Sequence, residues 1–173
     1  HDADSPKDMI EGQMEIKVRD SNAERIKTDL LVIPVREKKL DDALIRTVDR
    51  RLRGNLRARM QKSKFTGAEG GTLIYQTAGL LPAAQLLLIG LGGGAEIAGD
   101  TWRKIGARAR REAAALGAED IAFFFSPDKD SAIAGGALVE GALLAAYQFN
   151  KYRSSSKPPA EPKSFTLFNS GLR

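Results

Sequence analysis

The sequence predicts an α/β domain built on a mixed β-sheet of about six strands. The apolar run Leu86–Ile89 continues through Gly90 to Leu91, which is too short for a buried helix and fits a strand covered on both faces. An amphipathic helical pattern follows this run after a short loop. Strand, glycine turn and helix make one unit of an α/β domain, with this strand expected in the middle of the sheet and further units beside it.

The helix after the central strand is expected to begin with Asp100 or Thr101 as its N-cap and to end at Gly117 as a C-cap. Apolar and small residues recur along it at the spacing of one helical face: Trp102, Ile105, Gly106, Ala109, Ala113 and Leu116. The opposite face carries Arg103, Lys104, Arg108, Arg110 and Arg111.

Two strands are expected before the central unit. Residues 1–13 are polar and lack apolar periodicity, so we treat them as a tail left by cloning or as the start of a processed chain. Glu15–Arg19 alternates polar and apolar residues as a half-buried strand does. Asp29–Val35 has the composition of a buried strand, and Pro34 places it near a sheet edge or near its own end, because proline donates no hydrogen bond.

A helix is expected over about 40–52, with Leu44, Ile45, Val48 and Leu52 facing the core. β-Branched and aromatic residues predict a strand over 72–77. A short connection containing Pro82 joins that strand to the central one, so the two are expected to be antiparallel neighbours, which makes the sheet mixed.

The last third of the chain adds two strands and a helix. Residues 120–126 form a buried strand ended by Pro127, 131–152 a long helix, 154–163 a proline-containing linker and 164–169 a short strand. The helix contains Gly135, Gly136 and Gly141, each of which lowers helix stability by roughly 1 kcal/mol relative to alanine. Close packing on the sheet or on another helix is the expected compensation.

Length and composition fit one domain with its own core. The chain has 173 residues, of which 42% are hydrophobic and 28% charged, as in ordinary globular proteins. No apolar run approaches the ~20 residues needed to cross a bilayer, so no membrane partner is expected. With no cysteine, a disulfide framework and a thiolate metal site are excluded, and the cytoplasm is favoured as the compartment.

The net charge of +5 is concentrated in one segment. Between Arg46 and Lys64 there are eight basic residues and one acid, Asp49. A continuous helix would place Arg46, Arg50, Arg53 and Arg57 on one face, but Gly54 and Asn55 are expected to end or bend it. A solvated basic face is the favoured interpretation. Binding of nucleic acid such as DNA is the alternative, and its candidate contacts are Arg46, Arg50, Arg53, Arg57, Arg103 and Arg110.

The glycine cluster 90–95 has the form G-x-G-x-x-A directly after a strand. Such turns can place backbone amides against a pyrophosphate when a helix opens on them. Here residues 96–99 separate the cluster from the helix cap, and Glu96 would repel an anion. A structural turn is therefore favoured over a phosphate cradle.

No catalytic set is visible in the sequence. The only histidine is His1, so neither a zinc motif nor a Ser/His/Asp or Cys/His triad can be assembled. Capping and solvation explain the acids Asp41, Asp42, Asp49, Asp128 and Asp130. Glu140 lies inside an apolar helix, and a position on its wet side or a bond to a neighbouring loop is favoured over catalysis. Tyr147, Phe149 and Tyr152 are expected to pack or to sit at an interface.

Two motifs carry a family resemblance. The first is Leu87–Gly92 followed by a basic, alanine-rich helix. The second is Val139–Ser154, with a Glu-Gly pair and spaced Tyr, Phe and Tyr, followed by a proline-rich linker and a strand. Over residues 14–173 the chain resembles the amino-terminal domain of the leucine aminopeptidase (cytosol aminopeptidase) family. It departs at Gly93 and Arg153, where the family commonly has lysine.

The resemblance implies a three-layer, macro-domain-like fold, with a mixed sheet between helices. It also implies that the catalytic lysine and arginine and two divalent metals, zinc or manganese, belong to a carboxy-terminal domain that would begin beyond Arg173. No family catalytic residue can be carried onto this chain. The expected role is that of a non-catalytic domain, inactive alone, which packs on the catalytic domain of the same polypeptide.

In the family such a domain helps to build a homo-hexamer whose enclosed active sites remove N-terminal residues from peptide substrates. The resemblance therefore implies a cytoplasmic peptidase as the parent protein. A macro-like fold also raises ADP-ribose binding at residues 90–94 as an alternative, which the neighbouring Glu96 argues against.

Overall fold

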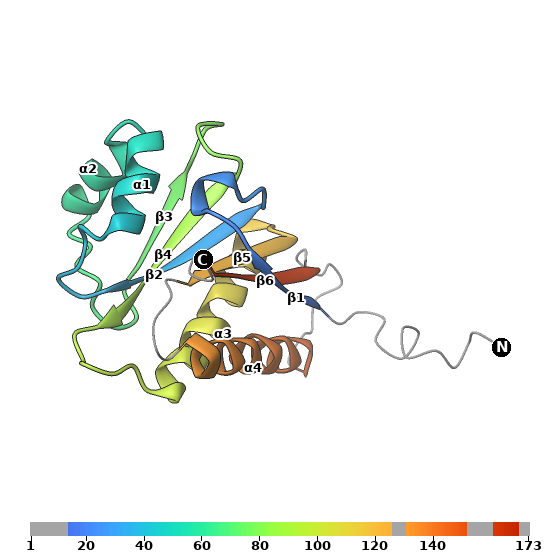
Figure 1. Ribbon diagram of the computed structural model, residues 1–173. Coiled ribbons are helices and arrows are strands. Elements are labelled where there is room, and N and C mark those ends of the chain that lie inside the picture. The colour runs from blue at the N-terminus through green and yellow to red at the C-terminus, as the bar shows by residue number, and fades with distance from the viewer. Residues whose placement is uncertain (1–13, 126–130, 152–160, 170–173) are drawn as a thin grey trace.

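The computed structural model describes residues 14–125, 131–151 and 161–169. Six strands and four α-helices follow one another with one short 3-10 helix, η2, near the start (Figure 1). In chain order they are β1 (Glu15–Asp20), η2 (Ala23–Arg25), β2 (Leu30–Arg36), α1 (Ala43–Arg51), α2 (Asn55–Lys62), β3 (Thr72–Gln76), β4 (Gln85–Gly92), α3 (Gly99–Leu116), β5 (Asp120–Phe125), α4 (Ser131–Lys151) and β6 (Ser164–Asn169).

Several expectations fall outside the described residues and stay predictions. These are the tail before Met14, the strand end at Pro127, the acids Asp128 and Asp130, the position of Tyr152 and most of the linker. The side chains of Tyr147 and Phe149 also lie outside what the structure describes.

The six strands form one sheet in the order β1-β6-β5-β2-β4-β3. Every neighbouring pair is parallel except β3 and β4, whose antiparallel pairing confirms the predicted mixed sheet. β4 is an interior strand, one place from the edge. β2 is also interior, so the edge interpretation of Pro34 is wrong. Its end interpretation holds, because β5 pairs with β2 only from Leu30 to Val32 and Pro34 lies beyond that ladder.

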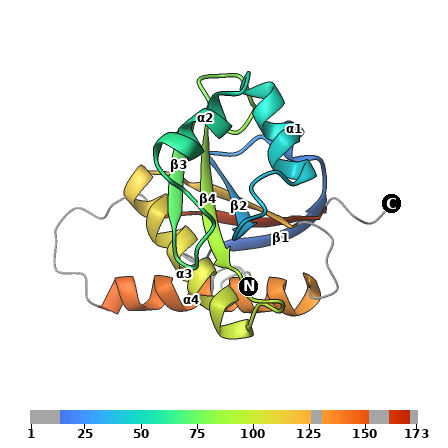
Figure 2. The ribbon, with the colours of Figure 1, turned by 90° about the vertical axis from the view of Figure 1, so that its left-hand side faces the viewer.

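Helices cover both faces of the sheet, which confirms the three-layer arrangement (Figures 1 and 2). Alternate residues of each central strand point to opposite faces. Leu30, Val32 and Phe123 therefore pack with α3 and α4, whereas Leu31 and Ile33 pack with α1 and α2. The first two helices lie over β2, β4 and β3 (Figure 1). Neither α1 nor α2 lies over β6 and β1 (Figure 1). On this face Ala122 and Phe124 of β5 are buried in one cluster with Ala23 of η2.

The starts of two helices differ from those expected. α1 begins at Ala43, three residues late, because the Asp42 side chain accepts the Ile45 amide at 2.8 Å and caps it. α3 begins earlier than expected, with Ala98 as its N-cap and no side-chain cap. Asp100 instead lies in the first turn, where its charge favours the helix dipole. The predicted caps Asp100 and Thr101 are therefore wrong, whereas Gly117 is the αL C-cap that the sequence predicts.

Glycines hold α3 and α4 in close contact, as expected for Gly141. A Cβ added there would lie 1.9 Å from the carbonyl oxygen of Arg103, and one added at Gly106 would lie 2.0 Å from that of Leu138. At Gly135 a Cβ would touch Leu167 at 3.4 Å. At Gly136 it would meet nothing within 4 Å, so close packing does not explain that glycine.

Candidate functional site

The predicted basic stripe is divided between two helices. Arg53 and Gly54 both have positive φ, at 59° and 80°, and they separate α1 from α2 as the sequence predicts. Arg46 and Arg50 lie one turn apart on α1, and Arg57 lies on α2. All four arginines of the stripe are exposed, in agreement with a solvated basic face.

Asp49, the one acid of the stripe, stabilises the start of α2. Asp49 is 8% exposed, and its Oδ1 accepts the backbone amide of Arg57 at 3.0 Å in the first turn of α2. Its backbone carbonyl accepts the amide of Gly54 at 2.9 Å. The guanidinium of Arg57 pairs instead with Asp41 at 3.2 Å. Asp49 therefore caps the second helix, and of the stripe's four candidate arginines Arg57 is held in an ion pair.

The two candidate contacts on α3 are in different surroundings. Arg103 is half-exposed and its Nε donates to Oε2 of Glu140 at 3.0 Å. Glu140 is thus on the wet side of α4, as predicted, and its partner comes from a helix rather than a loop. A phosphate that approached Arg103 would therefore compete with the carboxylate of Glu140.

Arg110 is only 6% exposed, so its predicted place on the exposed face is wrong. It follows Gly106 by four residues and precedes Ala113 by three, which puts it beside the packed face of α3. Its guanidinium lies 3.2 Å from the sulfur of Met14. Burial lowers the pKa of Arg110, and the nearby charge of Glu161 partly opposes that shift. Arg110 is therefore not available to nucleic acid.

The glycine cluster packs closely against the backbone of residues 67–71, in agreement with the structural-turn interpretation. The amide of Gly90 donates to Gly71 at 2.8 Å and that of Gly92 to Gly67 at 2.9 Å. A Cβ at Gly90 would lie 1.9 Å from the carbonyl oxygen of Ala68. The carboxylate of Glu37 also lies 3.0 Å from where a Cβ of Gly93 would be. Two amides of the turn are used inside the fold, and an acid stands beside it.

One hollow in the described surface was not foreseen from the sequence. It has a volume of about 290 Å³ and lies on one face of β5, β6 and β1. We call it the basic groove, because three cations and one acid, Asp120, line it together with three hydroxyl residues, Ala122 and Phe168. Its cations and hydroxyl residues are Lys17, Arg19, Lys27, Thr28, Ser164 and Thr166. The alternation of polar residues in β1 and β6 is the signal that could have indicated it.

Within residues 14–125, 131–151 and 161–169, no three histidine, cysteine, aspartate or glutamate residues gather as a metal site. None of the helices in that part of the chain is long and apolar enough to cross a membrane. Glu140 is paired and Asp49 is a helix cap. The features of the described surface that bear on binding are therefore the exposed arginines of α1 and the basic groove.

Comparison with known sequences decides the family. Residues 32–156 match the profile described as the cytosol aminopeptidase family, N-terminal domain. The chain belongs to this family. A probable cytosol aminopeptidase of Alkaliphilus oremlandii is 34% identical over 153 residues, which are 86% of this chain and 30% of that protein. The chain thus spans about a third of the length of such relatives.

Solved structures agree on the fold. A mutant of tomato leucine aminopeptidase superposes with a TM-score of 0.77 at 24% identity, over 93% of this chain and 33% of that one. The macrodomain of Thermus aquaticus DarG superposes with a TM-score of 0.63 at 9% identity, over 90% of this chain and 99% of that domain. The cytosol aminopeptidase domain described here therefore has the macro-like fold that the resemblance implied.

Proposed function

We propose that residues 14–173 are the non-catalytic amino-terminal domain of a leucyl aminopeptidase that removes N-terminal residues from peptides. Two divalent metals, zinc or manganese, and the catalytic residues would belong to a further domain of the same cytoplasmic polypeptide. The observation that carries this proposal is the match to the N-terminal part of the family, over about 30% of the length of a relative. Residues 1–13 would be a tail that precedes the domain.

The proposed role of this domain is assembly of a homo-hexamer and control of access to its active sites. Edge strand β1 exposes Val18 to 74% and Ile16 to 37%, and α4 exposes Leu144 to 52%. Large apolar side chains exposed in this way are available for packing on another domain or subunit. A domain that covers part of an enclosed active site limits which peptides enter it.

Peptidase assays separate the domain from its parent protein. We expect this chain to show no turnover of leucyl substrates with added Mn²⁺ or Zn²⁺, and the full-length polypeptide to hydrolyse them. The control is the same preparation of the chain after a second purification, which removes traces of host peptidases. Turnover by the chain that survives repurification would contradict the proposal.

Nucleic-acid binding is a second candidate, supported by exposed Arg46, Arg50 and Arg53, for which the described part of the chain contains no ion-pair partner. Replacing these three by glutamine should weaken retention on DNA and reduce the salt dependence of binding by about one unit per lost phosphate contact. The control replaces Lys104, Arg108 and Arg111, two of which are held by Asp100 and Glu112. If the two triple variants weakened DNA binding equally, the binding would be unspecific attraction to positive charge and these three arginines would not form a binding site.

We do not propose ADP-ribose as a ligand of the glycine turn. The amides of Gly90 and Gly92 are already donated to backbone carbonyls, and the Glu37 carboxylate stands beside Gly93. Calorimetry with ADP-ribose is therefore expected to give no saturable heat. Micromolar affinity that is lost when Gly92 is replaced would contradict this expectation.

A further inference from the structure

We propose that the basic groove binds the phosphate group of a small organic phosphate. The groove is lined by residues of β5, β6, β1 and the segment before β2. It lies on the part of the sheet that α1 and α2 do not reach (Figure 1). This inference does not depend on the proposed peptidase role, because it uses only residues of this domain. It also concerns a different place from the glycine turn at the end of β4.

The sheet brings distant parts of the chain into one row across the groove. In the parallel pairing of β1 with β6, Lys17 lies opposite Thr166, and in that of β5 with β6, Ala122 lies opposite Thr166. Residues opposite one another in a ladder point to the same face. An ammonium, a hydroxyl and a methyl group therefore follow one another on three strands, and the buried Ala122 forms part of the lining.

Two further cations border the same hollow. Arg19 lies two residues beyond Lys17 on β1, and Lys27 comes from the segment before β2. Neither has an ion-pair partner within the described part of the chain. Lys17 approaches Glu15 at 3.6 Å, but both side chains are solvent-exposed and such pairs stabilise little. The groove thus has a surplus of positive charge that a bound anion would neutralise.

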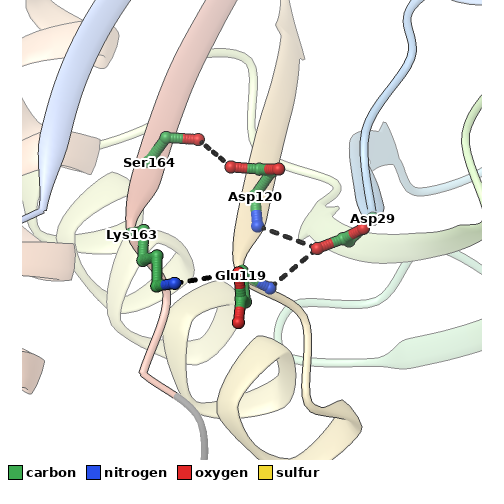
Figure 3. A network of polar contacts seen from close by, with 5 residues as sticks. All are labelled: Asp29, Glu119, Asp120, Lys163 and Ser164. Carbon is green, nitrogen blue, oxygen red and sulfur yellow. Dashed lines mark hydrogen bonds and ion pairs between the residues drawn. The ribbon is translucent and has the colours of Figure 1, made fainter.

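The carboxylates at the amino end of the groove, Asp120 in its lining among them, are already hydrogen-bonded or ion-paired within the protein (Figure 3). Oδ1 of Asp120 accepts the Ser164 hydroxyl at 2.7 Å. Oδ2 of Asp29 accepts the backbone amides of Glu119 at 2.9 Å and Asp120 at 3.1 Å, and Glu119 pairs with Lys163 at 3.2 Å. These contacts fix the ends of β5 and β6, so the groove is formed before any ligand binds.

The shape and charge of the groove favour a phosphate group of a small molecule. Lysine and arginine recognise oxyanions by charge-assisted hydrogen bonds, and a doubly charged phosphate matches three cations better than a carboxylate does. The hydroxyls of Thr28 and Ser164 already donate to Asp120, so the hydroxyl offered to the anion is that of Thr166. The volume of about 290 Å³ is at the small end of ligand sites. A polymer would have to continue past Glu15, whose charge repels phosphates.

Calorimetry on this 173-residue chain at constant ionic strength tests the proposal, with pyrophosphate, inorganic phosphate and phenyl phosphate as probes. We expect saturable binding that weakens about tenfold or more in Lys17→Gln/Arg19→Gln, because two charge-assisted contacts are lost. The matched control Arg59→Gln/Lys62→Gln removes the same charge from exposed positions of α2 and should stay within about twofold. Thr166→Val keeps all charges and should weaken binding less than the double groove variant.

Amide NMR spectra of the same samples locate the ligand and show that each variant is folded. Shifts confined to β1, β6 and the start of β5 would support the proposal. Phenyl phosphate binding as tightly as inorganic phosphate would assign the site to organic phosphates, and binding of inorganic phosphate alone would overturn that part. Absence of saturable binding, equally tight binding of citrate, or equal losses in the two double variants would overturn the proposal as a whole.

Discussion

Two glycines set the distance between α3 and α4. At Gly141 a methyl group would have to displace backbone of the facing helix, since a Cβ there lies 1.9 Å from the Arg103 carbonyl oxygen. Overpacking of this kind costs typically about 1 to 3 kcal/mol. Gly141→Ala is therefore expected to lower the free energy of unfolding by at least that amount, measured by chemical denaturation.

Gly136 in the same helix provides the matched control, because a Cβ there meets nothing within 4 Å. Gly136→Ala should leave stability unchanged or raise it by up to about 1 kcal/mol, through the higher helix propensity of alanine. Equal destabilisation by both substitutions would mean that close helix packing is not the reason for Gly141.

Asp49 shows how a single acid can remain among eight basic residues. Its side chain holds the first turn of α2 through the Arg57 amide, so Asp49→Ala should destabilise the domain by ~1 kcal/mol, as loss of a helix cap does. Asp41→Ala removes only the exposed ion pair with Arg57 and should change stability by less than about 0.5 kcal/mol. Thermal unfolding of the two variants compares them, and a larger effect of Asp41→Ala would contradict the capping role.

At the scale of elements, α3 is connected to the start of β1 through one buried cation. Arg110 touches Met14, directly before β1, and its charge is near Glu161, shortly before β6. Removing a buried hydrogen-bonding partner costs about 1 to 3 kcal/mol. Arg110→Ala should therefore speed hydrogen exchange of the β1 amides about tenfold or more.

The exposed neighbour Arg111 supplies the control for this experiment. Arg111→Ala should leave exchange in β1 unchanged, because its side chain is not part of the packed face. Unchanged exchange in both variants would mean that β1 is held by its ladder with β6 alone.

The bounds of the strands were predictable to within about a residue or two, because buried strands appear in the sequence as short apolar runs. Runs such as Leu86–Ile89 are apolar on both faces, and turns with glycine or proline bound them. Helix starts were less predictable. The N-cap of α3 is Ala98, which makes no side-chain capping bond, so the position of this start depends on the conformation of the turn after β4. Arg110 is buried against Met14, which is 96 residues away in the sequence, so the helical periodicity of α3 could not indicate this contact.

For the whole molecule, the feature that could not be predicted from the sequence is the pairing of β1 with β6. The two ends of the described chain meet in this ladder, where Glu15 lies opposite Ser164. Polar alternation in each strand was visible, but the groove exists only because these strands are neighbours in the sheet. The absence of a recognisable catalytic motif was visible in the sequence, since the only histidine is His1 and cysteine is missing.

Assembly is the property of the whole protein that the exposed edge should control. Val18, 74% exposed on β1, is proposed to pack against another domain or subunit of the full-length polypeptide. Val18→Glu in that polypeptide should shift sedimentation toward smaller species, while Lys17→Gln, which changes a charged neighbour, should not. An unchanged assembly in Val18→Glu would remove β1 from the proposed interface.

The central claim is that this domain is the amino-terminal part of a longer aminopeptidase. The most direct test is the intact mass of the endogenous protein, captured with an antibody raised against this 18.7 kDa chain. A relative of which 153 aligned residues are 30% has about 510 residues, so we expect a mass of roughly 50 to 55 kDa, several domains of ordinary size. A mass close to 18.7 kDa would contradict the account and leave the basic surfaces as the guide to function.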